Sequence, residues 1–173
     1  MRYLFIFLCF VFLLFSCNSE SKPAINNRVL PPDSLVKFRS LDFIVDGKPC
    51  LALINVGYKD FRKKKEFPLS LFITINTLEK DIVGHPTANE AIIFNKLESD
   101  ILSGLALKTC YIGQTTMNGY RDMMFYIASE DHEMVSEKLK IMKQKEKRIK
   151  SYTFENDPEW EAVSEFYDAI GSN

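Results

Sequence analysis

Side chains that often carry chemistry are few in this sequence, and their spacing is uninformative. His85 lies in a Gly-His-Pro turn, and His132 lies in the acidic first turn of an expected helix. Together with Cys50 and Cys110 they do not show the ligand spacing of a zinc site. The chain also lacks a Gly-x-Gly-x-x-Gly motif, a Walker loop and a Gly-x-Ser-x-Gly elbow. We therefore expect no metal, no cofactor and no catalytic residue that the sequence can identify.

Three other residues are candidates for a binding surface: Arg121, Asp122 and Trp160. Arg121 and Asp122 follow an Asn-Gly turn, where an ion pair could fix the turn or face a ligand. The structural interpretation is favoured, because exposed pairs near turns are common. Trp160 could staple a short helix to a sheet or, if half exposed, anchor a partner. The staple is favoured here too.

The charge balance argues against a nucleic-acid partner. The chain has 22 basic and 23 acidic residues, a net charge of −1. No strongly basic field is available to meet phosphates. A basic run at residues 62–65 could contact anionic lipid headgroups, but a solvated loop is the favoured interpretation.

The first part of the expected domain is a hairpin followed by a third strand. Residues 41–45 and 50–56 flank Asp46-Gly47, which is a strong signal for a tight turn. Residues 69–76 are rich in β-branched and aromatic side chains and are expected to form the third strand.

A helix is expected to begin after Thr87, because Thr87 and Glu90 have the spacing of a capping box. Gly104 is expected to mark its end. Its apolar positions recur at helical spacing and predict one buried face. These positions are Ala91, Phe94, Leu97, Ile101 and Leu105.

A second hairpin and a second helix follow. Residues 107–116 and 120–128 are apolar and joined through Asn118-Gly119, a second tight-turn signal. Ser129 is expected to cap a helix over residues 130–146, with acids at its start and lysines toward its end. The expected buried stripe consists of Met134, Val135, Leu139 and Met142.

A strand at residues 149–154 and a short helix complete the chain. Asp157 is expected to cap this helix, with Pro158 at its first position. Without the first hairpin, the order is strand, helix, strand, strand, helix, strand. We therefore predict an α+β fold, a ferredoxin-like split βαβ (βαββαβ) antiparallel sheet with an added N-terminal hairpin and a C-terminal helix.

The N-terminus predicts export. Residues 1–16 carry one charge, Arg2, followed by an apolar run that is too short to span a membrane comfortably. Residues 14–17, Leu-Phe-Ser-Cys, resemble a bacterial lipobox, which implies a signal peptide cleaved before Cys17 and acylation of Cys17. Stable anchoring needs two or more acyl chains.

Loss of the signal peptide removes Arg2 and no acid, which leaves 21 basic against 23 acidic residues and a net charge of −2. Residues 17–36 are expected to form a flexible tether and residues 37–173 the domain. Asn18 and Ser19 resemble the sorting residues that favour the outer membrane. An exported compartment permits a disulfide between Cys50 and Cys110, although two buried free thiols are the favoured interpretation.

Two segments also resemble the bacterial family known as domain of unknown function 695. They are Asn-Gly-Tyr-Arg-Asp at residues 118–122 with the following Phe-Tyr-Ile, and Asp-Pro-Glu-Trp at residues 157–160 ahead of Phe166-Tyr167. The resemblance spans roughly residues 43–170. That family is similar in turn to the regulator of ribonuclease E activity B, a ferredoxin-like protein that binds the nuclease. The resemblance implies a binding domain, but a cytoplasmic nuclease does not fit an exported chain.

We therefore expect a non-enzymatic, lipid-anchored domain of the cell envelope that recognises a protein or a peptide. The alternatives are an envelope hydrolase or transferase, in which Asp122 acts with Arg121, and a purely structural envelope component. A deep pocket lined by carboxylates of raised pKa would favour the enzyme, whereas a flat sheet face would not.

Overall fold

The computed structural model describes residues 35–82, 84–105 and 109–171. These ranges form an α+β fold with a six-stranded antiparallel sheet and three α-helices. Within them, no helix combines the length and apolar character needed to cross a membrane. The strands are β1 (Phe38–Val45), β2 (Lys48–Asn55), β3 (Leu69–Asn76), β4 (Thr109–Met117), β5 (Tyr120–Ile127) and β6 (Ile149–Asn156). The helices are α1 (Ala88–Leu105), α2 (His132–Lys145) and α3 (Ser164–Gly171).

Both predicted hairpins are confirmed, and their turns have the backbone geometry that the sequence requires. Asp46 and Gly47 have φ angles of 51° and 75°, and Asn118 and Gly119 have φ angles of 49° and 89°. Positive φ at both central residues matches the twist of the flanking strands. The turns therefore fix the register of β1 against β2 and of β4 against β5.

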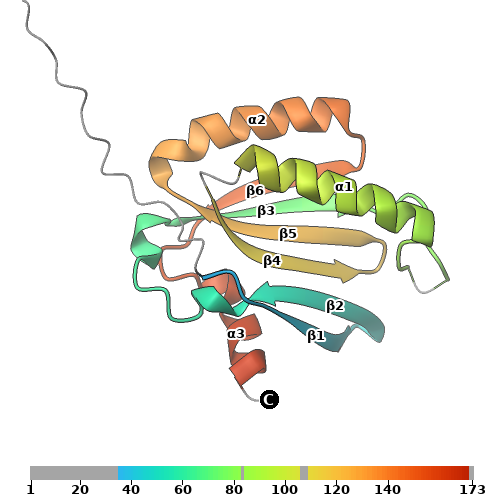
Figure 1. Ribbon diagram of the computed structural model, residues 1–173, viewed down its shortest axis with the longest axis horizontal. Helices are drawn as coiled ribbons and strands as arrows, with labels where there is room; N and C mark the ends of the chain where they lie inside the picture. The colour runs from blue at the N-terminus through green and yellow to red at the C-terminus, as the bar shows by residue number, and fades with distance from the viewer. Residues whose placement is uncertain (1–34, 83, 106–108, 172–173) are drawn as a thin grey trace, which may run out of the picture.

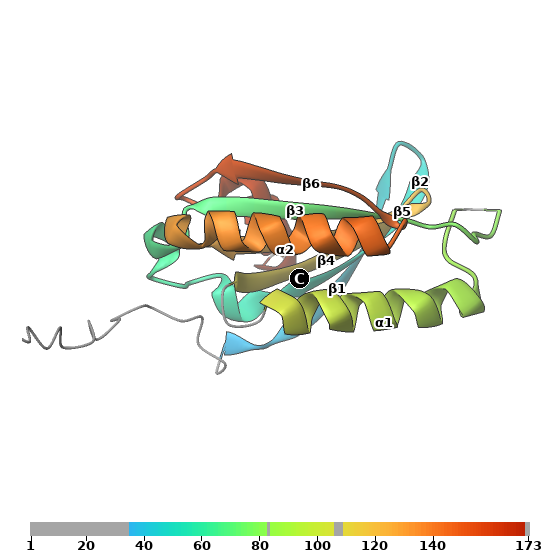
Figure 2. The same ribbon diagram turned by 90° about the horizontal axis from the view of Figure 1, so that it is seen from above.

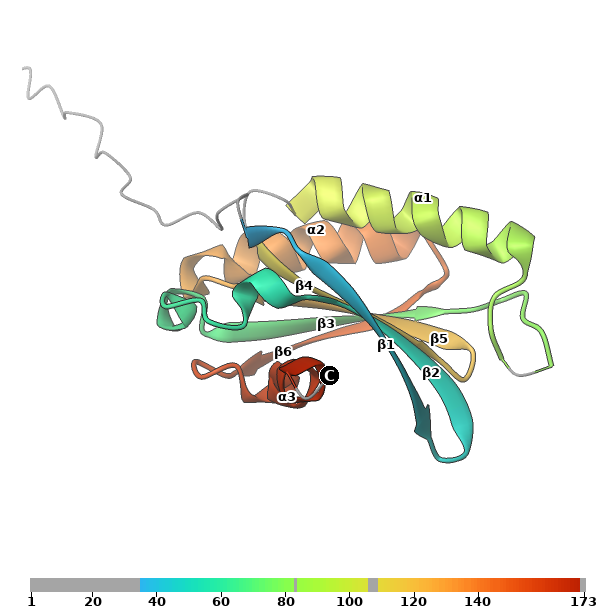
Figure 3. The same cartoon turned by 60° about the horizontal axis from the view of Figure 1, so that its bottom comes forward.

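The sheet has the strand order β1-β2-β4-β5-β3-β6, so β1 and β6 are its two edges. Helices α1 and α2 lie side by side on one face, and α3 lies on the opposite face (Figures 1, 2 and 3). The β1–β2 hairpin extends the sheet beyond β4 and twists away from α1 (Figure 3). This hairpin is therefore the part of the sheet that the two long helices cover least.

Each face of the sheet carries its own apolar core. The α1–α2 core joins both long helices to the sheet, with Phe94, Ile101 and Leu139 among its buried members. The Trp160 core lies on the other face, where Trp160, Val163 and Tyr167 pack against the strands.

A bulge in β4 bends the sheet where the hairpin departs. The pairing of β4 with β5 shifts register between Tyr111 and Gly113. Gly113 has a φ of 145°, and a Cβ at this position would collide with the carbonyl oxygen of Leu53. Only glycine permits this close approach of β2 to β4.

Half of the predicted capping box at α1 is wrong. The backbone N–H of Glu90 donates to Thr87 Oγ1 at 3.3 Å, as predicted. The Glu90 carboxylate, however, turns inward and is 0% exposed. It accepts a hydrogen bond from the N–H of Leu78 at 2.8 Å and two from the Arg148 guanidinium at 3.1 and 3.0 Å. A buried carboxylate needs such partners, because an unpaired buried charge is costly.

Helix α2 also differs from the prediction. Residues 129–131 form a 3-10 turn, and the α-helix begins at His132 with Asp131, not Ser129, at its N-cap. Val135 and Leu139 are buried as predicted, but Met134 is exposed on the outer side of the helix. Met134 and Val135 are successive residues and lie about 100° apart around the helix, so Met134 cannot share the buried stripe of Val135 and Leu139.

The Glu90–Arg148 pair gives a stability prediction. Arg148→Met would leave the Glu90 carboxylate buried without its main partner. We expect the free energy of unfolding to fall by roughly 3 kcal/mol. The matched control is Lys140→Met, which removes the partner of the exposed Glu137 at 3.3 Å. Its expected cost is below about 0.5 kcal/mol. Urea denaturation at neutral pH measures both, and equal losses would contradict a buried pair.

The pH dependence of the same pair has a definite sign. The hydrogen bonds from Arg148 hold the pKa of Glu90 below its ordinary value. The stabilisation is therefore present above the pKa of an unfolded glutamate and is lost as the pH falls through the folded pKa. The difference between the wild type and Arg148→Met should shrink in acid.

Candidate functional site

Arg121 and Asp122 do not act together, because they point to opposite faces of the sheet. They are successive residues of β5, and successive side chains of a strand alternate between its faces. Arg121 lies on the face of α1, where it contacts Glu98. Asp122 lies on the face of α3, where it contacts Thr74. An enzyme that uses this pair together is therefore not supported by the geometry.

Arg121 is held in a dense set of structural contacts. Its Nη1 lies 3.1 Å from Glu98 Oε2, and its Nε donates to Thr116 Oγ1 at 3.1 Å. Its guanidinium also lies 5.0 Å from the ring centroid of Phe94. The Arg121 and Glu98 side chains are only 12% and 19% exposed. Arg121 thus ties α1 to β5.

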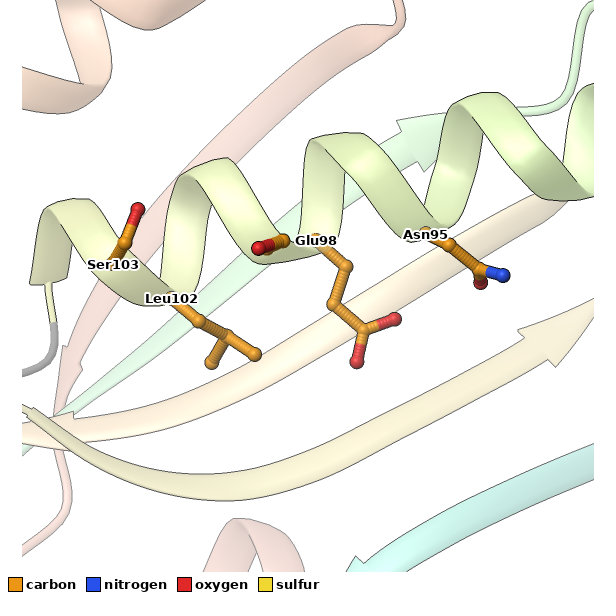
Figure 4. A pocket seen from close by; sticks show the side chains of 5 residues that line it. Asn95, Glu98, Leu102 and Ser103 are labelled. Atoms are coloured by element: carbon orange, nitrogen blue, oxygen red, sulfur yellow. The ribbon is translucent and has the colours of Figure 1, made fainter.

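A shallow groove, here called the α1 groove, opens beside this ion pair (Figure 4). Its lining residues are Asn95, Glu98, Ser99, Leu102 and Ser103. Figure 4 shows Asn95, Glu98 and Leu102 projecting from α1 toward the sheet. Because Glu98 is already paired with Arg121, the groove presents mainly amide, hydroxyl and apolar groups. It suits a contact surface better than a reaction centre.

The β1–β2 hairpin carries exposed apolar side chains on the face of α1. Ile44 is 69% exposed and Leu51 is 45% exposed. Ile44 is opposite Pro49, so Leu51 is its diagonal neighbour on the same face. The two side chains form an apolar patch, here called the hairpin patch, with the exposed Asp42 beside it and directly opposite Leu51.

A second groove, here called the β1–α3 groove, lies on the opposite face. It is lined by Leu41, Asp42, Phe43, Glu165, Phe166 and Ala169. The Phe43 and Phe166 rings are 6.4 Å apart in an edge-to-face arrangement. This groove runs beside the free edge of the sheet, and Asp42 and Glu165 are the acidic residues in its lining.

Asp122 is a partly buried carboxyl on the α3 face. Burial raises the pKa of Asp122 above its ordinary value, and the hydrogen bond from Thr74 and the charge of Lys150 only partly oppose this rise. Thr74 Oγ1 donates to Asp122 Oδ1 at 2.7 Å. Burial raises the pKa values of Tyr120 and Cys50, and the nearby Asp122 charge raises them further. Because Arg121 is paired with Glu98 on the other face, Asp122 is the remaining residue of the enzymatic alternative.

Trp160 is 1% exposed, so it does not meet the condition of half exposure on which its role as a partner anchor depends. Its Nε1–H donates to the carbonyl of Phe67 at 3.0 Å, and its ring stacks on Tyr126 with centroids 4.2 Å apart. It therefore fixes the segment after β6 to the sheet, as the favoured staple interpretation expects.

The predicted start of the last helix is also wrong. Trp160 has a φ of 63°, in the left-handed region, and α3 begins only at Ser164 after a 3-10 turn over Glu161–Val163. Asp157 still caps, because its carboxylate accepts from the N–H groups of Glu161 and Ala162 at 2.8 and 3.0 Å. Pro158 therefore lies in the preceding turn and not at the first helical position.

Cys50 and Cys110, the two cysteines in the described part of the chain, are buried free thiols, and no disulfide joins them. Their strands are neighbours, but Cys50 is opposite Met117, seven residues along β4 from Cys110. That separation is about 20 Å along a strand, far beyond the reach of a disulfide. Burial raises the pKa of the Cys110 thiol to about 12. Across residues 35–82, 84–105 and 109–171, no three His, Cys, Asp or Glu residues gather as metal ligands.

Other predicted features lie outside the described residues. These are the signal peptide, Cys17 and most of the tether. The described chain begins at Leu35, whose carbonyl packs so closely on Gly57 that a Cβ at Gly57 would collide with it. The tether thus joins the domain at the start of β1.

Sequence reasoning missed Glu98 and the β1–α3 groove. Glu98 lies 23 residues from Arg121 in the chain, so no local pattern connects them. The groove joins β1 to α3, which are more than a hundred residues apart. Residues 151–173 contain six acidic residues and no basic one, but composition alone does not place them beside β1.

The pKa of Asp122 gives the second prediction. A folded pKa above the unfolded value means that ionisation of Asp122 opposes folding, so its destabilising effect grows as the pH rises above the unfolded pKa. Asp122→Asn should keep the bond from Thr74 and raise the melting temperature at pH 7 but not at pH 3. Thermal unfolding at both values measures this. A lower melting temperature at pH 7 would mean that the charge of Lys150 outweighs the cost of burial.

Comparison with known proteins places the chain in one family. A family model described as a family of unknown function, DUF695, matches residues 43–167. Comparisons with curated proteins and with solved structures give no match. The match covers most of the chain, including β2 to β6 and all three helices except the end of α3. The chain therefore belongs to the DUF695 family, whose function is unknown.

Proposed function

We propose that this chain is a lipid-anchored domain of the bacterial cell envelope that binds a protein or a peptide and performs no catalysis. The observation that carries the binding role is the apolar patch of the β1–β2 hairpin, where Ile44 is 69% exposed. Contiguous exposed apolar side chains often mark protein contacts. The neighbouring α1 groove adds amide and hydroxyl groups that can hydrogen-bond to a partner.

The proposed location rests on the N-terminal sequence. An apolar run ends at Leu-Phe-Ser-Cys, residues 14–17, which resembles a lipobox. Acylation of Cys17 would anchor the chain stably, because each buried methylene contributes about 0.8 kcal/mol. Asn18 and Ser19 favour the outer membrane over the inner one.

We further propose that β3 to β6 with α1 and α2 form a ferredoxin-like split βαβ unit. Two observations support this assignment: the strand order β4-β5-β3-β6 and the antiparallel pairing throughout. Similarity to the regulator of ribonuclease E activity B would then be a similarity of fold and of general role, binding. The partner of that regulator is not part of the proposal.

Several polar groups that might do chemistry are committed to structural contacts, which argues against the enzymatic alternative. Arg121 pairs with Glu98, and Asp157 accepts a hydrogen bond from Tyr126. A hydrolase or transferase of envelope polymers would have to centre on Asp122, whose raised pKa is its one supporting feature. A single such carboxyl on a sheet face is weak support.

The anchor can be tested directly. We expect the native protein to sediment with membranes and its N-terminal peptide to carry the mass of acylated Cys17. Cys17→Ala should abolish acylation and leave the signal peptide uncleaved. Membrane fractionation followed by mass spectrometry measures both. A soluble, uncleaved wild-type chain in the cytoplasm would refute the proposed location.

The binding role can be tested on the hairpin patch. Crosslinking in intact cells should join the chain to a specific envelope protein. Ile44→Glu should reduce that adduct by about tenfold, because it places an unpaired charge in an apolar contact. The matched control is Ile141→Glu, since Ile141 is an exposed isoleucine on α2, with 43% of its surface exposed against 69% for Ile44. Quantitative mass spectrometry of the adduct reports the result. Equal losses for the two variants would count against this patch, and the lack of any specific adduct would count against the binding role.

A further inference from the structure

The outer edge of β1 carries unpaired backbone groups that another strand can use. The two-residue turn makes Val45 and Lys48 the closing hydrogen-bonded pair of the hairpin. By alternation, Arg39, Leu41 and Phe43 also bond to β2. The intervening residues direct their N–H and C=O groups away from the sheet, and no strand within the described ranges pairs with them. These residues are Phe38, Ser40, Asp42 and Ile44.

The two edges of the sheet are not equivalent. Edge strand β6 carries the exposed Lys150, and its pairing with β3 shifts register between Thr74 and Ile75. Lysines and bulges are common protections of an edge. The pairing of β1 with β2 is continuous over all eight residues of each strand. The edge with regular pairing is therefore that of β1, which lies beside the exposed hairpin patch.

The β1–α3 groove lies beside this free edge. Leu41 and Phe43 form its wall on β1, and Phe166 forms its wall on α3. A strand that pairs with β1 would direct every second side chain to the α3 face, toward this groove. Its other side chains would lie next to Ile44 on the α1 face.

The charge around the groove defines the partner further. Asp42 and Glu165 are both exposed and line it. Residues 151–173 contain acidic residues and no basic one. Asp42 lies between Leu41 and Phe43 on the strand, so its side chain is directed to the α1 face, whereas Glu165 lies on the α3 face. A basic residue next to the apolar side chain of the partner would point to the α1 face and complement Asp42.

We propose that β1 receives an extended peptide segment of another protein, which pairs with the free edge as an added strand. An apolar side chain of this peptide enters the β1–α3 groove on one face of the sheet, and a neighbouring Lys or Arg faces Asp42 on the other. This inference rests on the proposed binding function and specifies its mode and partner chemistry.

The probe for this site is the synthetic peptide Lys-Val-Thr-Phe-Thr-Val-Lys, acetylated and amidated, with a fluorescent label. Its binding to the full chain, purified as the cell produces it, is measured by fluorescence anisotropy. Two further peptides carry N-methyl groups, one on the odd-numbered and one on the even-numbered amides. Comparing them shows which set of amides donates hydrogen bonds to β1. We expect one form to bind like the parent and the other to bind about tenfold more weakly, because it loses the hydrogen bonds to β1.

Variants of the chain provide the matched controls. Ser40→Pro removes an outward N–H without touching the β1–β2 ladder and should weaken binding by about tenfold. Ser40→Ala retains the N–H and should bind like the wild type. Asp42→Asn should weaken binding less and reduce its dependence on salt.

Three outcomes would overturn the inference. They are the absence of binding at millimolar peptide, equal affinity for the two methylated forms, and equal affinity for Ser40→Pro and Ser40→Ala. The inference would also be overturned if a second copy of this chain occupied the edge of β1. Sedimentation would then show a dimer for the wild type and a monomer for Ser40→Pro. These measurements need neither the acyl anchor nor the envelope protein, so the inference and the proposed function can fail separately.

Discussion

Strand β5 is buried on both faces of the sheet, and this constraint determines how the rest of the chain is arranged. Met123, Phe125 and Ile127 face the α1–α2 core, whereas Met124 and Tyr126 face the Trp160 core. Two helices are enough to cover the first face. The second face would expose its apolar side chains to water without the segment after β6, so this segment is part of the core and not an appendage.

The cover of the second face depends on an unusual backbone conformation. Trp160 reaches Tyr126 only because it adopts the left-handed conformation, which a bulky residue rarely does. Asp157 supports this turn from both sides, since it accepts hydrogen bonds from the following backbone and from the Tyr126 hydroxyl. Those hydrogen bonds outweigh the effect of burial and keep the pKa of Asp157 low. The Asp-Pro-Glu-Trp segment is thus explained by packing, with no need for a ligand.

The features that could be predicted from the sequence are those set by local chemistry. Asp-Gly and Asn-Gly placed both hairpins, and the β-branched run at Leu69–Asn76 gave the third strand with its observed bounds. The errors have a different origin. Glu90 was expected to cap its own helix, but it pairs with Arg148, 58 residues away. Trp160 was placed inside a helix, because the stacking on Tyr126 that holds its backbone outside the helix is a tertiary contact. The candidate site is formed by such tertiary contacts, so only part of it could be predicted from the sequence.

The hairpin stands apart from these constraints. The packing of the two cores does not explain why Ile44 and Leu51 are exposed beside the free edge of β1. An exposed apolar edge normally carries a risk of aggregation. In the proposed arrangement this edge begins where the tether joins the domain, at Leu35 against Gly57. A tethered chain meets partners in the same membrane at high effective concentration, so a modest contact at this edge is enough for association. Exposed apolar side chains at this edge would favour aggregation of a freely diffusing protein. In an anchored protein they are compatible with specific binding of a partner.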